Sequence, residues 1–394
     1  MSSLQTTAVA ASEDRLHDAL ELARGGRAAE MRRDLSAALS RYEEARSLLA
    51  AVEPTPLYAN LLRWSGSVLR DLGRVAEADK LYTDSFDVAD RTGAITAKAS
   101  ALNCRAVIAQ RRGDLDEATA LYRRAARHAV EGGEIRLSGM IEQNLGVLAN
   151  IRGDLDGALV RYRAALRAFQ EVSDDEAVSW VLNNMGMLLN DLGLPLRAEK
   201  SFLQGLEIAR ARRDRPMEGV LRANYAESLI ALKRWEEAAK QLDQSLAIAR
   251  AGDDMARVGE ALKFRGVLER ERGELDTATA LLDAALSIGE DVSDPLLVAE
   301  SLRERGELRR RKGMTEEALD DWEAARRGFK ELHATLDANN LTVRMEALLD
   351  QLRRAHWTNG EGMVPGTNGT AGAEKRAHHD GTGHGARSIE ETAE

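Results

Sequence analysis

Apolar and polar residues alternate along most of this chain with the period of an α-helix. In the stretch from Val181 to Leu192 the apolar residues recur at spacings of three and four, and similar stretches begin near Glu13. Such spacings place apolar side chains on one face of a helix. The pattern therefore predicts an all-α protein.

The helical stretches repeat with a period of 40 residues. The segment from Arg112 to Asp116 returns almost unchanged from Arg152 to Asp156. Stepping by this period gives eight copies of one turn position, occupied by Arg33, Gly73, Gly113, Gly153, Gly193, Lys233, Gly273 and Gly313. A fixed period of this length is typical of stacked supersecondary units. We expect eight repeats, each with a helix A before the turn position and an antiparallel helix B after it.

Small and large residues recur at fixed places within each repeat. In the fourth repeat Ala158, Tyr162 and Ala165 follow the turn position by five, nine and twelve residues, and the other repeats match this order of small, large and small. A further small residue, here Gly146, lies seven residues before the turn position, inside helix A. A glycine inside a helix costs about 1 kcal/mol relative to alanine unless close packing offsets it. We therefore expect helices A and B to approach each other closely at these positions.

This set of positions resembles the tetratricopeptide repeat, in the 40-residue variety found in kinesin light chains and in bacterial peptide-binding regulators of the Rap kind. The resemblance covers residues 13–336. It implies a right-handed superhelical solenoid of about eight helix pairs. It also implies a binding platform for a protein or peptide, not an enzyme.

The two ends of the chain differ from the repeats. Residues 1–12 are small and polar without a period, which predicts a disordered segment. Residues 337–356 carry regularly spaced apolar residues and are expected to form a helix that caps the last repeat. Residues 357–394 are rich in Gly, Thr and Glu with almost no apolar content, which predicts a disordered tail.

Composition and charge limit the classes of partner that we expect. The formal net charge is −10, a poor electrostatic match for nucleic acid. No segment approaches the roughly 18 consecutive apolar residues of a membrane span. The only cysteine is Cys104, and residues 1–11 do not resemble a secretory signal. We expect a cytoplasmic protein without a nucleic-acid or membrane partner, and the sequence does not indicate its oligomeric state.

Asparagines recur in the A helices, two or three residues before the small residue. They are Asn103, Asn144, Asn183, Asn184 and Asn224. An asparagine offers a donor and an acceptor, which suits binding to the backbone of an extended peptide. The segment 182–186 resembles the asparagine-bearing helices with which kinesin light chains and Rap-like regulators hold peptides. The alternative is that these side chains cross-link neighbouring A helices within the fold.

Trp180 and Met187 lie on either side of Asn183 and Asn184 at helical spacing. They are expected either to line an apolar pocket of a peptide-binding groove or to belong to the core. A clamp for a ligand carboxylate is not supported, because it needs a basic residue three before the small position together with Asn or Arg just after that position. Arg63, Lys263 and Arg303 are followed by Ser67, Val267 and Glu307.

No residues indicate catalysis, a metal site or a cofactor. The histidines His378, His379 and His384 lack carboxylate or cysteine partners at ligand spacing. The sequence favours a non-enzymatic scaffold that holds an extended peptide or protein segment in a concave groove formed by the A helices. Two alternatives remain, a peptide-responsive regulatory sensor and an assembly or oligomerisation scaffold that acts through its outer surface or tail.

Overall fold

The computed structural model describes residues 3–50 and 54–358. Within these residues the regular structure consists of seventeen α-helices and no strand, as the sequence predicts. The chain divides into two compact units, Met1–Met345 and Glu346–Glu394. The described part of the second unit is only the end of the last helix, and the eight repeats lie in the first unit.

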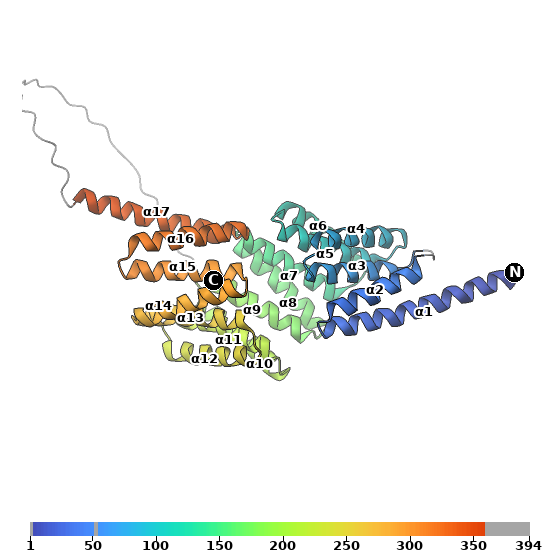
Figure 1. Ribbon diagram of the computed structural model, residues 1–394, viewed down its shortest axis with the longest axis horizontal. Helices are drawn as coiled ribbons and strands as arrows, with labels where there is room; N and C mark the ends of the chain where they lie inside the picture. Colours follow the sequence, from blue (N-terminus) through green and yellow to red (C-terminus); the bar gives the residue numbers. More distant parts are fainter. Residues whose placement is uncertain (1–2, 51–53, 359–394) are drawn as a thin grey trace, which may run out of the picture. The chain divides into compact units, whose positions relative to one another are not determined.

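Helices A and B alternate through eight repeats (Figure 1). The A helices are α1 (Ser3–Met31), α3 (Pro56–Asp71), α5 (Ile95–Arg111), α7 (Ile135–Ile151), α9 (Asp175–Asp191), α11 (Arg215–Ala231), α13 (Met255–Arg272) and α15 (Pro295–Arg311). The B helices are α2 (Leu35–Leu49), α4 (Val75–Arg91), α6 (Leu115–Glu131), α8 (Leu155–Glu171), α10 (Pro195–Ala211), α12 (Trp235–Ala251), α14 (Leu275–Asp291) and α16 (Thr315–Glu331). A last helix, α17 (Thr335–Thr358), follows the eighth repeat.

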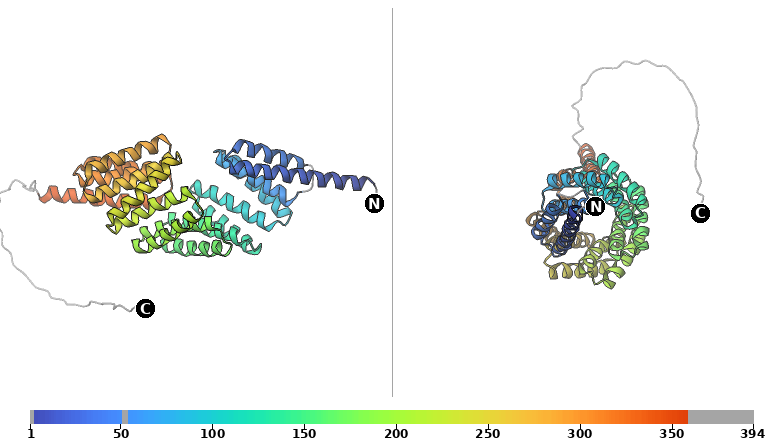
Figure 2. Two further views of the ribbon diagram at one scale, coloured as in Figure 1. Left: turned by 90° about the horizontal axis from the view of Figure 1, so that it is seen from below. Right: turned by 90° about the vertical axis from the view of Figure 1, so that its right-hand side faces the viewer.

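Each B helix from α2 to α14 packs between the A helix of its own repeat and that of the next (Figure 2). The A helices of successive repeats also pack directly on one another, from α1 with α3 to α13 with α15, whereas no two B helices do so to a similar extent among the described residues. The A helices therefore form the inner layer. The series has one interruption, since α7 and α9 make at most marginal contact.

The predicted close approach of helices A and B is confirmed. A side-chain Cβ on Gly186 of α9 would lie 2.5 Å from the ring of Phe202 in α10, and one on Gly306 would overlap the ring of Trp322. Each glycine therefore makes room for a ring. The large residue is buried in every repeat, as Tyr42, Tyr82, Tyr122, Tyr162, Phe202, Leu242, Leu282 and Trp322.

Two series of turns connect the helices. Every residue at the turn position has a positive φ, including Arg33 and Lys233 with φ of 59° and 58°. A second series, which was not predicted from the sequence, lies halfway between these turns and joins one repeat to the next. It comprises Gly93, Gly133, Ser173, Arg213, Asp253, Ser293 and His333, all with positive φ. The chain thus turns through the left-handed region about every 20 residues, and most turns of the second series do so without glycine.

Aspartate side chains fix the start of several A helices. Asp174, Asp214, Asp254 and Asp294 each accept a hydrogen bond from the backbone N–H three residues further on. Asp154 caps the B helix α8 in the same way. These bonds satisfy N–H groups that have no partner inside the helix. They explain why helices begin directly after the second series of turns.

The ends of the chain differ in part from the predictions. Helix α1 begins at Ser3, whereas the sequence predicted a disordered segment over residues 1–12. The segment holds no proline or glycine, and its Ala, Leu and Gln residues are good helix formers that continue the helix. A helix is present where the capping helix was expected, and Ala338 and Leu341 in it are buried. The predicted tail lies outside the described residues except for Trp357 and Thr358. No described helix combines the length and apolar character needed to cross a membrane.

The left-handed backbone at Lys233 has a measurable cost. An L-residue with a side chain is strained in this conformation, whereas glycine is not. We expect Lys233→Gly to raise the free energy of unfolding by about 0.5 to 1 kcal/mol in urea titrations. Lys233→Ala is the matched control, because it removes the ammonium group and keeps the strain. A lower stability for Lys233→Gly than for Lys233→Ala would contradict the prediction.

Candidate functional site

One face of α9 is open to the interior of the array. Trp180, Asn184, Met187 and Asp191 follow one another at spacings of four, three and four, which places them on one face of the helix. Trp180 and Met187 are 39% and 43% exposed, Asp191 is exposed and Asn184 is half-buried. We call this face of α9, with the equivalent faces of the other A helices, the inner face.

The inner face of the later repeats is hollowed. A cavity of about 510 Å³ is lined by residues of the A helices α9, α11, α13 and α15 and of the last helix, α17. Its lining includes Asp191, Glu227, Phe264, Arg270, Glu304 and Asp337. These charged residues were not identified as site residues from the sequence. Part of the signal was present, since Glu304 and Glu227 occupy the positions equivalent to Asn184 and Met187 in the 40-residue register.

Four of the predicted asparagines form two cross-links between neighbouring A helices. Asn144 Nδ2 donates to Asn103 Oδ1 at 3.1 Å, and Asn224 Nδ2 donates to Asn183 Oδ1 at 2.9 Å. Asn103, Asn183 and Asn224 are buried. The structural alternative considered for these side chains is therefore realised in the fold. A role in peptide binding stays a prediction for them.

Asn144 and Asn184 have the accessible amides of the set. Both are half-buried, and the side chain of Asn184 forms no hydrogen bond with another residue in the described part of the chain. They stand on α7 and α9, the one pair of successive A helices that makes at most marginal contact. The cross-links join α5 to α7 and α9 to α11 but do not span this junction. A ligand could therefore meet accessible amides on both sides of it.

The remaining predicted residues are placed as follows. Trp180 and Met187 are too exposed to be core residues. Cys104 occupies the position equivalent to Asn144 one repeat earlier, and it is half-buried. Burial raises the pKa of its thiol, so the group stays protonated near neutral pH.

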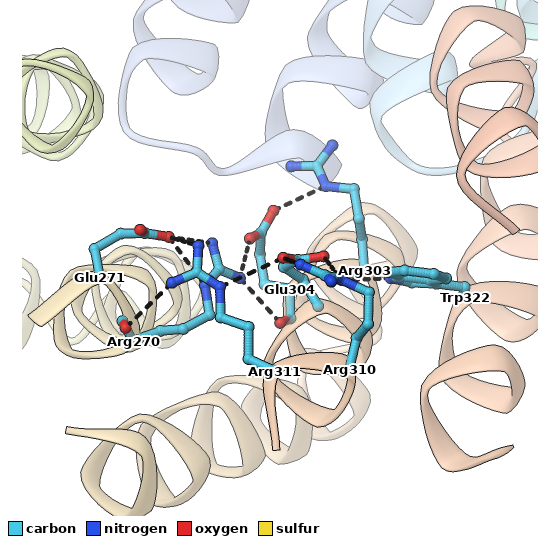
Figure 3. A network of polar contacts seen from close by, with 8 residues as sticks. Arg270, Glu271, Arg303, Glu304, Arg310, Arg311 and Trp322 are labelled. Atoms are coloured by element: carbon cyan, nitrogen blue, oxygen red, sulfur yellow. Dashed lines mark hydrogen bonds and ion pairs between the residues drawn. The ribbon is translucent and has the colours of Figure 1, made fainter. Parts of the chain in front are cut away.

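A network of ion pairs joins α13 to α15 (Figure 3). Arg270, which is 6% exposed, donates to a carboxylate oxygen of Glu304 at 2.8 Å. Arg303 contacts Glu304 at 2.9 Å and Asp337 at 3.2 Å. Arg311 reaches back to Glu271 at 2.7 Å. The basic residues of these repeats are therefore paired with carboxylates across and along the helices.

A second buried pair lies in the same repeats. Lys263 is 3% exposed, and its Nζ donates to Glu300 at 2.5 Å. A buried ammonium group is tolerated only with such a partner, since its desolvation is costly. Two residues considered for a carboxylate clamp, Lys263 and Arg303, are thus already occupied by carboxylates of the protein itself.

The carboxylates of the cavity differ in their pKa values. Burial would raise the pKa of Glu304, but Arg303 and Arg270 lower it to about 2. Partial burial and the neighbouring carboxylates of Glu227 and Asp337 raise the pKa of Asp191 to about 6. Burial also raises the pKa of Glu227, despite a hydrogen bond from Asn190 at 3.1 Å. Neither Asp191 nor Glu227 forms an ion pair with another described residue, although Arg303 lies near both. These two carboxylates are therefore available to a cationic group of a ligand.

The described residues hold no group of three or more His, Cys, Asp or Glu side chains that could bind a metal ion. The arrangement of amides, exposed apolar side chains and carboxylates suits recognition of a polypeptide. Such a surface can bond to a backbone, bury side chains and attract basic groups.

Comparisons with known proteins give a family and a fold. Tetratricopeptide-repeat family models match residues 99–127 and 137–211. No curated protein sequence matches the chain. The matched segments lie within the third to fifth repeats, and the same helix pair recurs through the other repeats described above.

Three solved structures illustrate the similarity of fold. The quorum sensor NprR from B. thuringiensis, in its apo form, has a TM-score of 0.62 at 16% identity, over 79% of this chain and 87% of that one. A Rap protein complexed with competence and sporulation factor has a TM-score of 0.57 at 13% identity, over 87% and 99%. The Rap conjugation gene regulator of plasmid pLS20, in complex with the Phr* peptide, has a TM-score of 0.55 at 20% identity, over 72% and 76%.

Replacement by alanine should lower the stability more at the cross-linking Asn224 than at the accessible Asn184. Asn224→Ala removes the donor to a buried carbonyl oxygen of Asn183, which costs about 1 to 3 kcal/mol of unfolding free energy. Asn184→Ala breaks no hydrogen bond within the described structure, so its unfolding free energy should change by less than about 0.5 kcal/mol. Urea titration monitored by circular dichroism measures both. Equal losses in the two variants would contradict the assignment.

The raised pKa of Asp191 predicts a pH-dependent stability. A carboxyl whose pKa rises from 3.8 to about 6 on folding stabilises the fold below about pH 4, and this contribution is lost as the pH rises through 6. We expect Asp191→Asn to unfold at a higher temperature than the unchanged protein at about pH 7, and at the same temperature at about pH 4. The gain is about 1 kcal/mol, because solvent screens an exposed carboxylate.

Asp87→Asn is the matched control for net charge, because Asp87 is an exposed residue of α4 away from this cavity. An equal gain in both variants would show that the effect comes from net charge and not from the neighbours of Asp191.

Proposed function

Since the chain belongs to the tetratricopeptide-repeat family, we propose that it is a non-enzymatic scaffold that binds an extended peptide or protein segment along its inner face. The observation that carries the proposal is the pair of accessible amides, Asn144 and Asn184, on either side of the weakly packed junction between α7 and α9. A peptide backbone laid across the junction can bond to both side chains.

The neighbours of Asn184 give the ligand a side-chain preference. Trp180 and Met187 offer exposed apolar surface on the same face of α9. Asp191 and Glu227 offer negative charge at the other end of that face. The ligand we propose therefore carries apolar side chains next to a basic side chain or its own amino terminus.

A peptide-responsive sensor is the second candidate, and one observation favours it. The α7–α9 junction lacks the direct packing that joins the other A helices of the series. A ligand that bridges it would add contacts that the free protein lacks, and so would favour a more closed arrangement of the repeats. Two of the similar structures are Rap proteins in complex with the Phr* peptide and with competence and sporulation factor. The radius of gyration with and without ligand separates a sensor from a passive scaffold.

A display library of unstructured peptides, selected on the full chain, tests the binding function. We expect a selected peptide to bind in fluorescence anisotropy titrations, and Asn144→Ala and Asn184→Ala each to weaken its affinity roughly tenfold by removing one or two hydrogen bonds. Gln204→Ala is the matched control, because it removes an exposed amide from the B helix of the same repeat as Asn184.

Two outcomes would overturn the proposal. One is that no peptide is selected by the unchanged protein. The other is that the selected peptides bind all three variants equally. Binding that survives both substitutions but is lost on deletion of residues 359–394 would instead support a scaffold that acts through its tail.

A further inference from the structure

A second cavity opens at the other end of the inner face. It has a volume of about 560 Å³ and lies between α9, α11, α12 and α13. Its apolar lining includes Met217, Val220 and Ile248, which are 2%, 7% and 9% exposed, and the accessible indole of Trp180. Charged groups such as Arg215 and Arg257 also line it.

The polar groups in this cavity already have partners. Ser245 Oγ donates to the carbonyl of Gly219 at 2.9 Å. Asp214 and Asp254 accept bonds from the backbone N–H groups of Met217 and Arg257. An apolar ligand would therefore displace water without leaving these groups unpaired.

The repeat register relates one part of this cavity to a buried ring in two other repeats. The buried rings of Phe169 and Phe329 stand two repeats before and two repeats after Ala249, which lines the cavity. In the fourth repeat the ring of Phe169 packs against Gly139, where a Cβ would lie 3.0 Å from it. The equivalent glycine in the sixth repeat is Gly219, which also lines the cavity, and Ala249 provides no ring there. The nearest side chain is that of Ile248, 3.2 Å from the position of a Cβ on Gly219. The place of the benzyl group of the fourth repeat is therefore one part of this larger cavity.

We propose that this cavity is a pocket for a phenylalanine side chain of the peptide bound on the inner face. Trp180 lines the pocket and lies one helical turn before Asn184 on the same face of α9. A backbone held by Asn184 therefore passes close enough to insert a side chain. The inference rests on the proposed function for the peptide, but the pocket can be tested without one.

The probe is N-acetyl-phenylalanine amide, with N-acetyl-alanine amide as the reference compound, added to the full chain labelled on Met and Ile methyl groups. We expect the methyl resonances of Met217 and Ile248 to shift saturably with the phenylalanine probe, with a dissociation constant of about 1 mM, and not with the alanine compound. Equal shifts with both compounds would overturn the pocket.

Ala249→Phe places a benzyl group in the cavity and should weaken probe binding about tenfold, because the new ring competes with the probe for the same space. Ala247→Phe is the matched control, because it adds the same ring at an exposed position of α12 and should leave binding unchanged. Trp180→Ala alters an accessible wall, so it tests the pocket even if Ala249→Phe fails to fold. It should weaken binding severalfold, and unchanged binding would overturn the proposal.

Two other occupants are distinguished in the same experiment. Probe binding that appears only after deletion of residues 359–394 would assign the pocket to the protein's own tail, and binding only on dilution would assign it to a second copy. Either result overturns the proposal. The probe has no extended backbone, so its binding does not depend on Asn144 and Asn184. The probe can therefore fail to bind while a peptide still binds to these asparagines, and the probe can bind while no peptide does.

Discussion

The close approach of helix A to helix B determines the rest of this structure. In most repeats a glycine on helix A faces a buried ring or leucine on helix B, as Gly186 faces Phe202. The ring has space only because the glycine has no side chain, and the lost helix propensity of the glycine is offset by the contact. This contact fixes the angle within each pair. The A helices are then left free to pack on one another and to form the inner layer.

Much of this architecture could be predicted from the sequence because packing residues repeat with the period. The residue type that a turning or packing position requires recurs at that position through the eight repeats. A pattern repeated this often does not arise by chance. The second series of turns escaped prediction for a physical reason. Ser173, Arg213, Asp253, Ser293 and His333 adopt the left-handed conformation although their residue types do not require it, and the capping aspartates after several of them compensate part of the strain.

The candidate site was predicted only in part, because contacts across repeats cannot be read from one repeat. The asparagines were found by their register, but the sequence could not say that Asn183 bonds to Asn224 while Asn184 stays accessible. The carboxylates of Asp191 and Glu227 were missed, because each looks like an ordinary surface charge until the A helices bring them together. The pocket beside Trp180 was also missed, since its lining comes from three successive repeats.

The inner face combines two properties that suit recognition of a flexible ligand. Its cross-linked helices α5 with α7 and α9 with α11 are held in fixed positions by buried amide bonds. Between these two pairs α7 and α9 make at most marginal direct contact, and α8 packs against both. Part of a site can therefore be organised on each side of this junction.

Because the later repeats contain buried ion pairs, their stability changes with temperature differently from that of the earlier repeats. Charges such as Lys263 with Glu300 and Arg270 with Glu304 carry a desolvation cost that falls on heating, because the hydration of ions becomes less favourable. The second repeat instead depends on apolar contacts such as Tyr82 against Gly66. In a repeat array each unit contacts mainly its neighbours, so the weaker units can melt first. On heating, the amino-terminal repeats should therefore unfold first and the charged repeats last.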